Sequence, residues 1–160
     1  MSVLPTVTNA PSLKTGNIIT ISRLYCVILI VFAVTQLFSF SDFQLLVQSY
    51  WLPGGVPSAS LLSGVIVIVE VFALPFLLRM KVSRLFRTVS MVLGWLVAVI
   101  WLIICLWLLL TVNAVTNIGF LGTVFSLTPG WWSVLVSLAL VILAAWASWG
   151  MWPSSRTGKK

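Results

Sequence analysis

Glu70 has the clearest capacity for chemistry among the residues of this 160-residue chain. It is one of only two acidic residues, the other being Asp42, and it lies inside a long apolar segment. Glu70 precedes Arg79 by nine residues, so helical rise places it ~13 Å from that end of the segment, near the middle of a bilayer. An isolated carboxylate at this depth is costly, so we expect Glu70 to be protonated, paired or facing a wet cavity.

The candidate partners of Glu70 lie on the first apolar segment. Gln36 is ~6 Å from the level of Glu70 by helical rise, whereas Arg23 is near the inner edge and would more easily reach lipid headgroups. Pro75 adds local polarity, because it leaves the carbonyl of Val71 without its helical donor. Three interpretations stay open: a neutral Glu70 hydrogen-bonded to Gln36 or to a backbone carbonyl, a role in handling a proton or substrate, and an ion pair with Arg23.

Other reactive residue types are scarce. Cys26 and Cys105 are predicted to differ in depth by more than ~15 Å, too far for a disulfide, so both are expected to be buried thiols. The chain has no histidine, and its sequence shows no metal-ligand cluster, phosphate-binding loop or serine with a base. We therefore predict no catalytic residue, no metal and no cofactor, and expect a protein that is not an enzyme.

The elements that would position these residues are transmembrane helices. With 61% hydrophobic and 7% charged residues, the chain has too little polar surface to cover a soluble globule. Four apolar stretches could each cross ~30 Å of hydrocarbon, at about 21–40, 58–78, 88–112 and 131–151. The first is expected to be retained, because no cleavage pattern of a signal peptide follows it. We predict an all-α integral membrane protein with an antiparallel four-helix transmembrane bundle.

The basic residues predict how this bundle is threaded. All nine flank the first stretch, the second connection or the last stretch: Lys14, Arg23, Arg79, Lys81, Arg84, Arg87, Arg156, Lys159 and Lys160. The connections at about 41–57 and 113–130 contain none. Since connections rich in Lys and Arg stay in the cytoplasm, both termini are predicted there, in a multi-pass protein of the inner (plasma) membrane. The positive charge favours anionic headgroups as partners and not nucleic acid.

This threading divides the chain into three parts. Residues 1–17 are predicted to be a flexible cytoplasmic tail, 18–152 the four-span membrane domain, and 153–160 a basic cytoplasmic tail. No second domain boundary is visible, and the sequence leaves the oligomeric state undetermined.

The connection after the first stretch is predicted to contain a short amphipathic helix. Its apolar residues recur at helical spacing: Phe43, Leu46, Val47 and Tyr50. Ser41 followed by Gln44 fits a capping box at its start. Two interpretations stay open, a helix that rests on the headgroups at the interface and a lid over an outward-facing cavity.

Small residues and tryptophans predict packing and depth. Ser90, Gly94 and Ala98 recur every four residues in the third stretch, and Ser133, Ser137, Ala144 and Ser148 follow one face of the fourth, as in close helix seams. Tryptophans are expected at the outer interface (Trp51, Trp131, Trp132), at the inner one (Trp149, Trp152) and deeper, for lipid contact or packing (Trp95, Trp101, Trp107, Trp146).

Several short motifs together resemble the DoxX/MauE group of small four-span membrane proteins. They are Arg23, Phe38-Ser39-Phe40-Ser41-Asp42-Phe43, Tyr50-Trp51-Leu52-Pro53 and Glu70 in an apolar second span. The segments Ile118-Gly119-Phe120-Leu121-Gly122 and Trp131-Trp132-Ser133-Val134-Leu135 are similar to the MauE branch, the methylamine-utilisation E proteins. The resemblance covers about residues 18–150.

The resemblance implies an accessory role, in maturation or assembly of an extracytoplasmic redox-type partner, as in methylamine metabolism. The outer-loop cysteine pair of the family is absent here, since its Cys-Gly-Cys-Phe-Gly pattern corresponds to 118–122, and Gln36 replaces a lysine common in the family. Thiol exchange is therefore not expected. A periplasmic or membrane protein partner would meet the outer loops, through Asp42, Phe43, Tyr50, Gly119, Phe120 and Gly122. The alternatives are a small proton-linked carrier using Glu70 and a structural subunit of a larger membrane complex.

Overall fold

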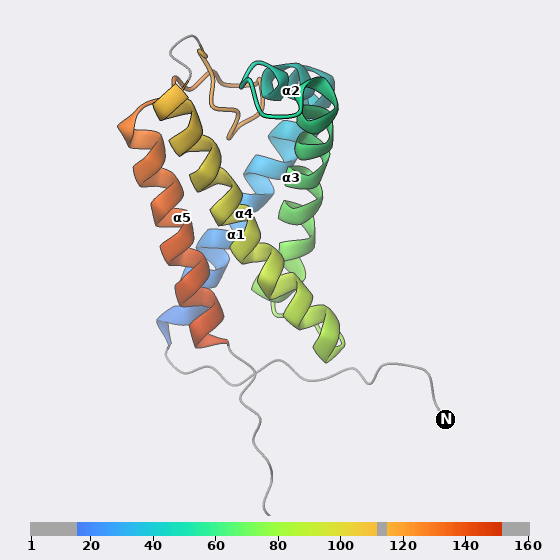
Figure 1. Ribbon diagram of the computed structural model, residues 1–160. Coiled ribbons are helices and arrows are strands. Elements are labelled where there is room, and N and C mark those ends of the chain that lie inside the picture. The colour runs from blue at the N-terminus through green and yellow to red at the C-terminus, as the bar shows by residue number, and fades with distance from the viewer. Residues whose placement is uncertain (1–15, 112–114, 152–160) are drawn as a thin grey trace, which may run out of the picture.

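The described part of the chain is all-helical. The computed structural model describes residues 16–111 and 115–151, and in these ranges it contains five helices and no strand. They are α1 (Asn17–Phe38), α2 (Phe40–Gln48), α3 (Gly55–Leu77), α4 (Arg84–Thr111) and α5 (Trp131–Gly150) (Figure 1). The tails predicted at 1–17 and 153–160 lie outside the described residues, except for residues 16 and 17, which are the N-cap and the first residue of α1.

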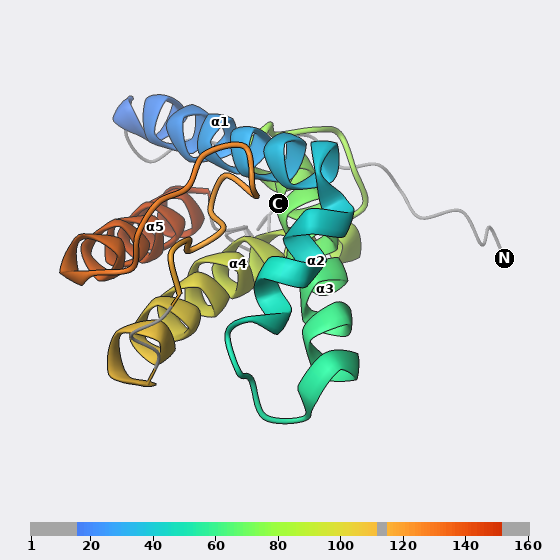
Figure 2. The same ribbon diagram turned by 90° about the horizontal axis from the view of Figure 1, so that it is seen from above.

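The four long helices enclose a common core. α1 packs against α3 and α5, and α4 packs against the same two helices. The short α2 packs across one end of α3, and the connection 115–130 extends over the same end of the molecule towards α1 (Figure 2). We call α2 with the three residues after it (residues 40–51), together with the connection 115–130, the cap. The connection between α3 and α4 lies at the opposite end, as does the start of α1 (Figure 1).

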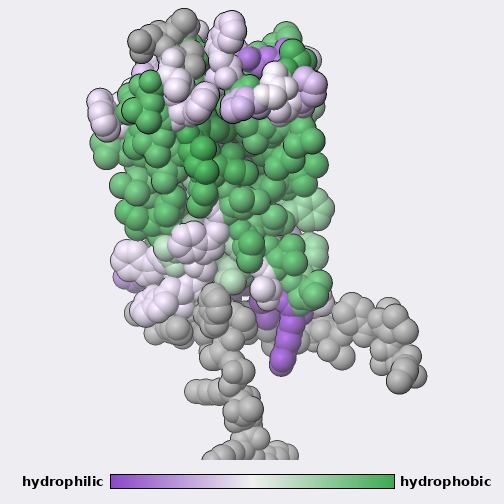
Figure 3. All heavy atoms as spheres, viewed as in Figure 1, coloured by the Kyte–Doolittle hydropathy of each residue, from purple (hydrophilic) through white to green (hydrophobic). Residues whose placement is uncertain are grey.

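All four long helices have the length and composition of membrane spans. Each contains a strongly apolar 18-residue window with few charged residues. Large apolar side chains cover the middle of the molecule as a broad belt, and the polar residues gather at its two ends (Figure 3). This distribution is the one that a hydrocarbon layer requires, and it supports a multi-pass membrane protein.

The ends of the first two helices differ from the sequence prediction. α1 begins four residues earlier than predicted and ends at Phe38, because Ser39 leaves the helical conformation (φ −126°). α2 then begins at Phe40, with Ser39 as its N-cap and no side-chain capping bond. The capping box of Ser41 and Gln44 is therefore wrong, since Ser41 already lies within the first turn. The short helix itself is confirmed.

The predicted small-residue stripes form seams inside the molecule. Ser90, Gly94 and Ala98 are buried on α4, as are Ser133, Ser137, Ala144 and Ser148 on α5. The Tyr25 hydroxyl of α1 donates a 2.6 Å hydrogen bond to the carbonyl of Gly94. This bond joins α1 to the backbone of α4 at the small-residue stripe, where helices pack closely.

A serine from α4 supplies polarity where Pro75 interrupts α3. The hydroxyl of Ser90 accepts a 3.0 Å hydrogen bond from the amide of Phe76 and donates a 2.7 Å hydrogen bond to the carbonyl of Phe72. Backbone groups in an apolar medium need such partners, because no water is there to replace them. Ser90 on the neighbouring helix thus binds backbone groups on both sides of Pro75, at Phe72 and Phe76, whereas the carbonyl singled out from the sequence was that of Val71.

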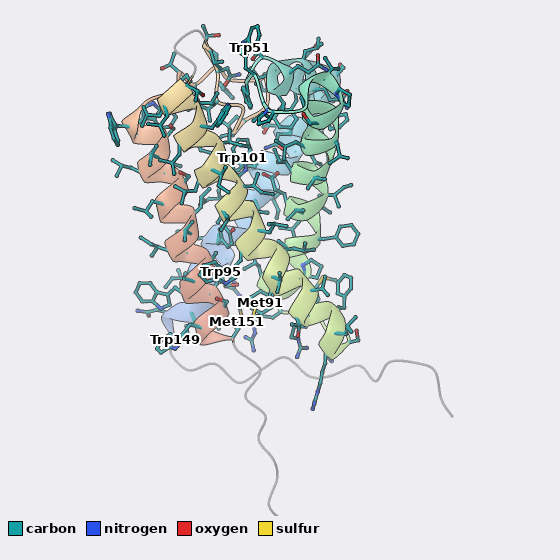
Figure 4. All side chains as sticks on the ribbon, in the orientation of Figure 1. Trp51, Met91, Trp95, Trp101, Trp149 and Met151 are labelled. Carbon is teal, nitrogen blue, oxygen red and sulfur yellow. The ribbon has the colours of Figure 1, made fainter. Side chains whose placement is uncertain are left out.

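The tryptophans divide between the ends and the interior. Trp51 lies at the cap end and Trp149 at the opposite end, and both are well exposed (Figure 4). Trp131 and Trp132 begin α5 at the cap end, while Trp152 lies outside the described residues. Trp101 differs from all of these because it is fully buried.

Candidate functional site

The Glu70 side chain is fully buried and joins three elements. It projects from α3, and its Oε1 accepts a hydrogen bond from Nε1 of Trp101 on α4 at 2.9 Å. The same oxygen lies 3.4 Å from Nε2 of Gln36 on α1, a longer hydrogen bond. The predicted pairing of Glu70 with Gln36 is confirmed, and Trp101 is a partner that the sequence did not indicate.

Two oxygens of this cluster lack a hydrogen-bond partner among the described residues. They are Oε2 of Glu70 and Oε1 of Gln36, and both are inaccessible to solvent. A buried acceptor without a donor costs about 1–3 kcal/mol, so two of them in neighbouring side chains are unusual. Either oxygen would be satisfied by a proton or a donor placed between the side chains.

Gln36 also connects Glu70 to the cap. Besides its contact with Glu70, Nε2 donates a 3.2 Å hydrogen bond to the carbonyl of Phe120 in the connection 115–130. One amide group thus holds both the buried acid and the backbone of the cap. A movement of Phe120 away from the helices would break this bond.

The Phe120 ring closes the cluster on the cap side. It stacks on Phe32 of α1, with ring centroids 5.3 Å apart, and lies 4.7 Å from the Trp101 ring at a tilt of 58°. Trp132 of α5 adds a more distant edge contact at 6.4 Å. Because Trp101 touches Phe120 with its ring and Glu70 with its N–H, the aromatic cluster lies directly beside the buried acid. Such packed rings exclude water from it.

The connection 115–130 holds Phe120 in place through Asn117. Its Oδ1 accepts from the amides of Gly119 at 3.0 Å and Leu127 at 3.2 Å, and its Nδ2 donates to the carbonyl of Gly122 at 3.0 Å. Asparagine commonly organises turns by bonding nearby backbone groups. Three backbone bonds from one buried side chain make this loop an ordered structure.

Two glycines allow the loop to approach the helices. Gly119 and Gly122 have positive φ values of 83° and 59°. A Cβ on Gly122 would lie 2.9 Å from the carbonyl oxygen of Thr35, and one on Gly119 would lie 2.6 Å from the Tyr50 hydroxyl. Only glycine fits both the backbone conformation and the available space.

Tyr50 connects the loop to the end of α2. It is fully buried, and its hydroxyl donates a 2.5 Å hydrogen bond to the carbonyl of Ile118. Its own carbonyl accepts from the Trp107 indole of α4 at 3.0 Å. Burial, and secondarily the nearby Cys105, raises the pKa of Tyr50 well above its ordinary value, so this hydroxyl stays a donor.

The structure corrects the expected partner-facing surface. Of the six residues expected to meet a partner, only Asp42 is exposed, whereas Phe43, Tyr50, Gly119, Phe120 and Gly122 are buried. They are buried because the apolar face of α2 and the loop pack against each other and the helices. The cap instead exposes other apolar side chains: Leu45, Trp51, Val124 and Phe125.

Arg23 is not brought to the cluster. It is exposed on α1, thirteen residues before Gln36, which corresponds to ~20 Å along the helix. This distance exceeds the reach of an arginine side chain, so the structure gives no support to the ion pair with Glu70. The two cysteines, Cys26 and Cys105, are both buried and free, as predicted.

The sequence missed Trp101 and the carbonyl of Phe120. Trp101 is one of nine tryptophans in the chain, and its spacing did not distinguish it from those that pack or face lipid. A weak signal was present, since an indole needs a hydrogen-bond acceptor when it is buried. The Phe120 carbonyl has no signal of its own, because a backbone atom is placed only by the fold.

The chemistry of the cluster is that of a carboxyl group held by neutral donors. In the described ranges no three His, Cys, Asp or Glu side chains gather as they would to hold a metal ion. The arrangement can hold and release a proton on Glu70, and it can fix the cap to the helices through Gln36. Comparison with protein-family models, curated proteins and solved structures gives no match, so the resemblance to the DoxX/MauE group stays a prediction.

Proposed function

We propose that this protein is an accessory protein of the inner (plasma) membrane that supports maturation or assembly of an extracytoplasmic partner. In this proposal the long helices form an antiparallel bundle of four spans, and α2 lies at the outer interface. The partner would be of the redox type that the MauE-like resemblance implies, with methylamine utilisation as one case. The role is non-enzymatic, and the partner would bind the cap.

The orientation rests on the positions of the basic side chains. Arg23 lies early in α1, and Arg79, Lys81, Arg84 and Arg87 lie around the connection between α3 and α4, at the end opposite the cap (Figure 1). The cap contains no basic residue. The positive-inside rule then favours a cytoplasmic α3–α4 connection and an extracytoplasmic cap, with both termini in the cytoplasm.

The observation that carries the accessory role is the surface of the cap. Its interior is ordered by Asn117 and Tyr50, yet it exposes Leu45 (62%), Trp51 (79%) and Phe125 (61%). An ordered frame that presents large apolar side chains is typical of a protein-binding surface, because little ordering is needed on contact.

The partner can be sought with photo-crosslinking amino acids placed in the cap. Substitution at Phe125 or Trp51 is expected to trap a membrane or extracytoplasmic protein in intact cells. Phe43, in the same cap but fully buried, is the matched control and should trap only this chain. A lipid-facing position such as Leu61 controls for random collision in the membrane. Equal yields from Leu61 and Phe125, or self-crosslinks alone, would argue against the accessory role.

The threading has its own test. Single cysteines at Asp42 and Thr123 should react with a membrane-impermeant maleimide added outside the cell, and a cysteine at Lys81 should react only after permeabilisation. Reaction of Asp42 and Thr123 from opposite sides would refute the proposed orientation.

A second candidate function is a small proton-linked carrier, which the two unpaired buried oxygens favour. It predicts proton flux into liposomes that contain the protein, followed with a pH-sensitive dye. Glu70→Gln should abolish this flux while the protein stays folded, because an amide cannot release a proton in this range. Unchanged flux in the variant would remove the carrier from consideration.

A further inference from the structure

The feature that carries a further inference is the pair of unpaired oxygens in the interior. These oxygens are Oε2 of Glu70 and Oε1 of Gln36. The two side chains already contact each other through their other polar atoms, Oε1 of Glu70 and Nε2 of Gln36. A carboxylate and an amide oxygen are both acceptors, so neither can satisfy the other. One proton on Oε2 changes this, because it converts that oxygen into a donor and the amide oxygen of Gln36 into its acceptor.

We propose that Glu70 and Gln36 form an occluded site for one exchangeable proton, and that Phe120 is its gate. In the closed state the carboxylic acid of Glu70 carries the proton on Oε2. On release, the O–H bond breaks and the proton passes to a water molecule, which becomes hydronium and leaves a carboxylate. The site does not depend on either proposed function, since it concerns the occupancy of Glu70 and not a partner or a transported substrate.

The gate follows from the contacts of Phe120. Its ring contacts both Phe32 and Trp101, which also contact each other, and its carbonyl is bonded to the Gln36 amide that also touches Glu70. In the proposed gate, water from the cap side reaches Oε2 once this ring moves. Because the same amide bonds the acid and the loop, loss of the Gln36 bond and opening of the loop are one event.

Glu70 is the group that would exchange a proton at this site, as the charged and titratable groups of the neighbouring elements indicate. The connection 115–130 and α5 contain no charged residue, and the acidic residue of α2, Asp42, is exposed. Arg79 lies just beyond the end of α3, nine residues after Glu70. On α4, Arg87 precedes Trp101 by fourteen residues, ~21 Å away. The other interior titratable side chains on the packed helices are Tyr25, Cys26 and Cys105.

Chemical labelling with dicyclohexylcarbodiimide tests the site. This apolar reagent adds whole to a protonated carboxyl group in an apolar environment, and the adduct rearranges to a stable N-acylurea. The full chain in lipid nanodiscs is treated over a range of pH, and the modified residue is located by mass spectrometry. We expect labelling at Glu70 that slows as the pH rises, no labelling at this position in Glu70→Gln, and no change on adding sodium at constant pH.

Variants of the gate complete the test. Phe120→Ala should speed the labelling of Glu70 about tenfold or more, which corresponds to ~1.4 kcal/mol lost from the closed state. Gln36→Leu removes the bond to the loop and leaves the ring, so it should act in the same direction even if Phe120→Ala folds poorly. Phe125→Ala, an exposed position of the same loop, is the matched control and should label at the wild-type rate.

Several results would overturn the proposal. Protection by sodium at constant pH would show that a metal cation, not a proton, occupies the site. Labelling that does not change with pH would remove the exchangeable proton. Equal rates in the wild type and in both gate variants would remove the role of Phe120. Each readout is the labelling of Glu70, so it can fail independently of the crosslinking and flux experiments.

Discussion

The indole of Trp101 donates to the same oxygen of Glu70 that Gln36 contacts, and at 2.9 Å it is the shorter of the two bonds. Trp101 comes from α4 and Glu70 from α3, so this bond joins two neighbouring long helices in the interior. It is made beside the ring of Phe120, in a region without access to solvent.

Trp101→Phe is expected to lower the free energy of unfolding by about 1–3 kcal/mol, because it removes a donor from a buried carboxyl group and keeps an aromatic ring. The measurement is denaturant unfolding of the detergent-solubilised protein. Trp95→Phe is the control, since that indole donates to the hydroxyl of Ser148 at a partly exposed position and should cost less. Equal losses in the two variants would contradict a special role for the Trp101 bond.

Ser90→Ala should destabilise the protein by about 1–3 kcal/mol, because the amide of Phe76 and the carbonyl of Phe72 lose their shared partner. Ser63→Ala is the matched control: Ser63 is also buried, but its hydroxyl bonds only to the Ser60 carbonyl of its own helix. Unfolding curves of the two variants decide the matter. If Ser63→Ala lowers the stability as much as Ser90→Ala, the bonds of Ser90 between α3 and α4 contribute no more than a bond within one helix.

Gly122→Ala should loosen the cap, because its φ of 59° is unfavourable for alanine and the new Cβ would meet the Thr35 carbonyl at 2.9 Å. We expect a loss of about 1–3 kcal/mol and faster hydrogen exchange at the amides of 117–127. Gly64→Ala, within α3 and with open space around the added methyl group, should be neutral or stabilise by up to about 1 kcal/mol. Unaltered exchange in Gly122→Ala would show that the loop does not depend on this close approach.

Alkaline pH should weaken the cap through Tyr50. Its pKa is raised by burial in the folded protein, so its stabilising contribution is complete below the ordinary tyrosine pKa of about 10 and is lost as the pH rises above that value. Tyr50→Phe should therefore flatten the decline in stability above about pH 10, by up to one proton or ~1.4 kcal/mol per pH unit. Parallel slopes for the wild type and Tyr50→Phe, from unfolding curves between pH 9 and 11, would contradict this assignment.

The sequence predicted the long helices well because their signal is local. Apolar runs, the basic residues around them and the small residues of α4 each act within a few turns, and the structure confirms the apolar helices and the buried seams. Gln36 could also be predicted as a partner of Glu70, because depth along two helices follows from helical rise. These features can be predicted without knowing how segments that are distant in the sequence pack together.

The cap could not be predicted in the same way. Its residues look like an exposed connection, with glycines, an asparagine and isolated aromatic residues, and we expected Phe120 to face a partner. Its burial depends on Asn117 and on the fit of Gly122 against α1, which are contacts between segments far apart in the sequence. The role of Trp101 was missed for the same reason, since it depends on which face of α4 meets α3.

The residues of the Glu70 cluster are synthesised at different times, because they lie far apart in the sequence. A ribosome makes Gln36 and Glu70 early, Trp101 later and Phe120 after three-quarters of the chain has emerged, so an unfinished chain holds the acid with an incomplete set of donors. Only the last 60 residues, from Trp101 onward, supply the indole and the ring of Phe120. Premature termination before residue 101 would thus leave a nascent product whose polar defect is exposed to membrane quality-control proteases.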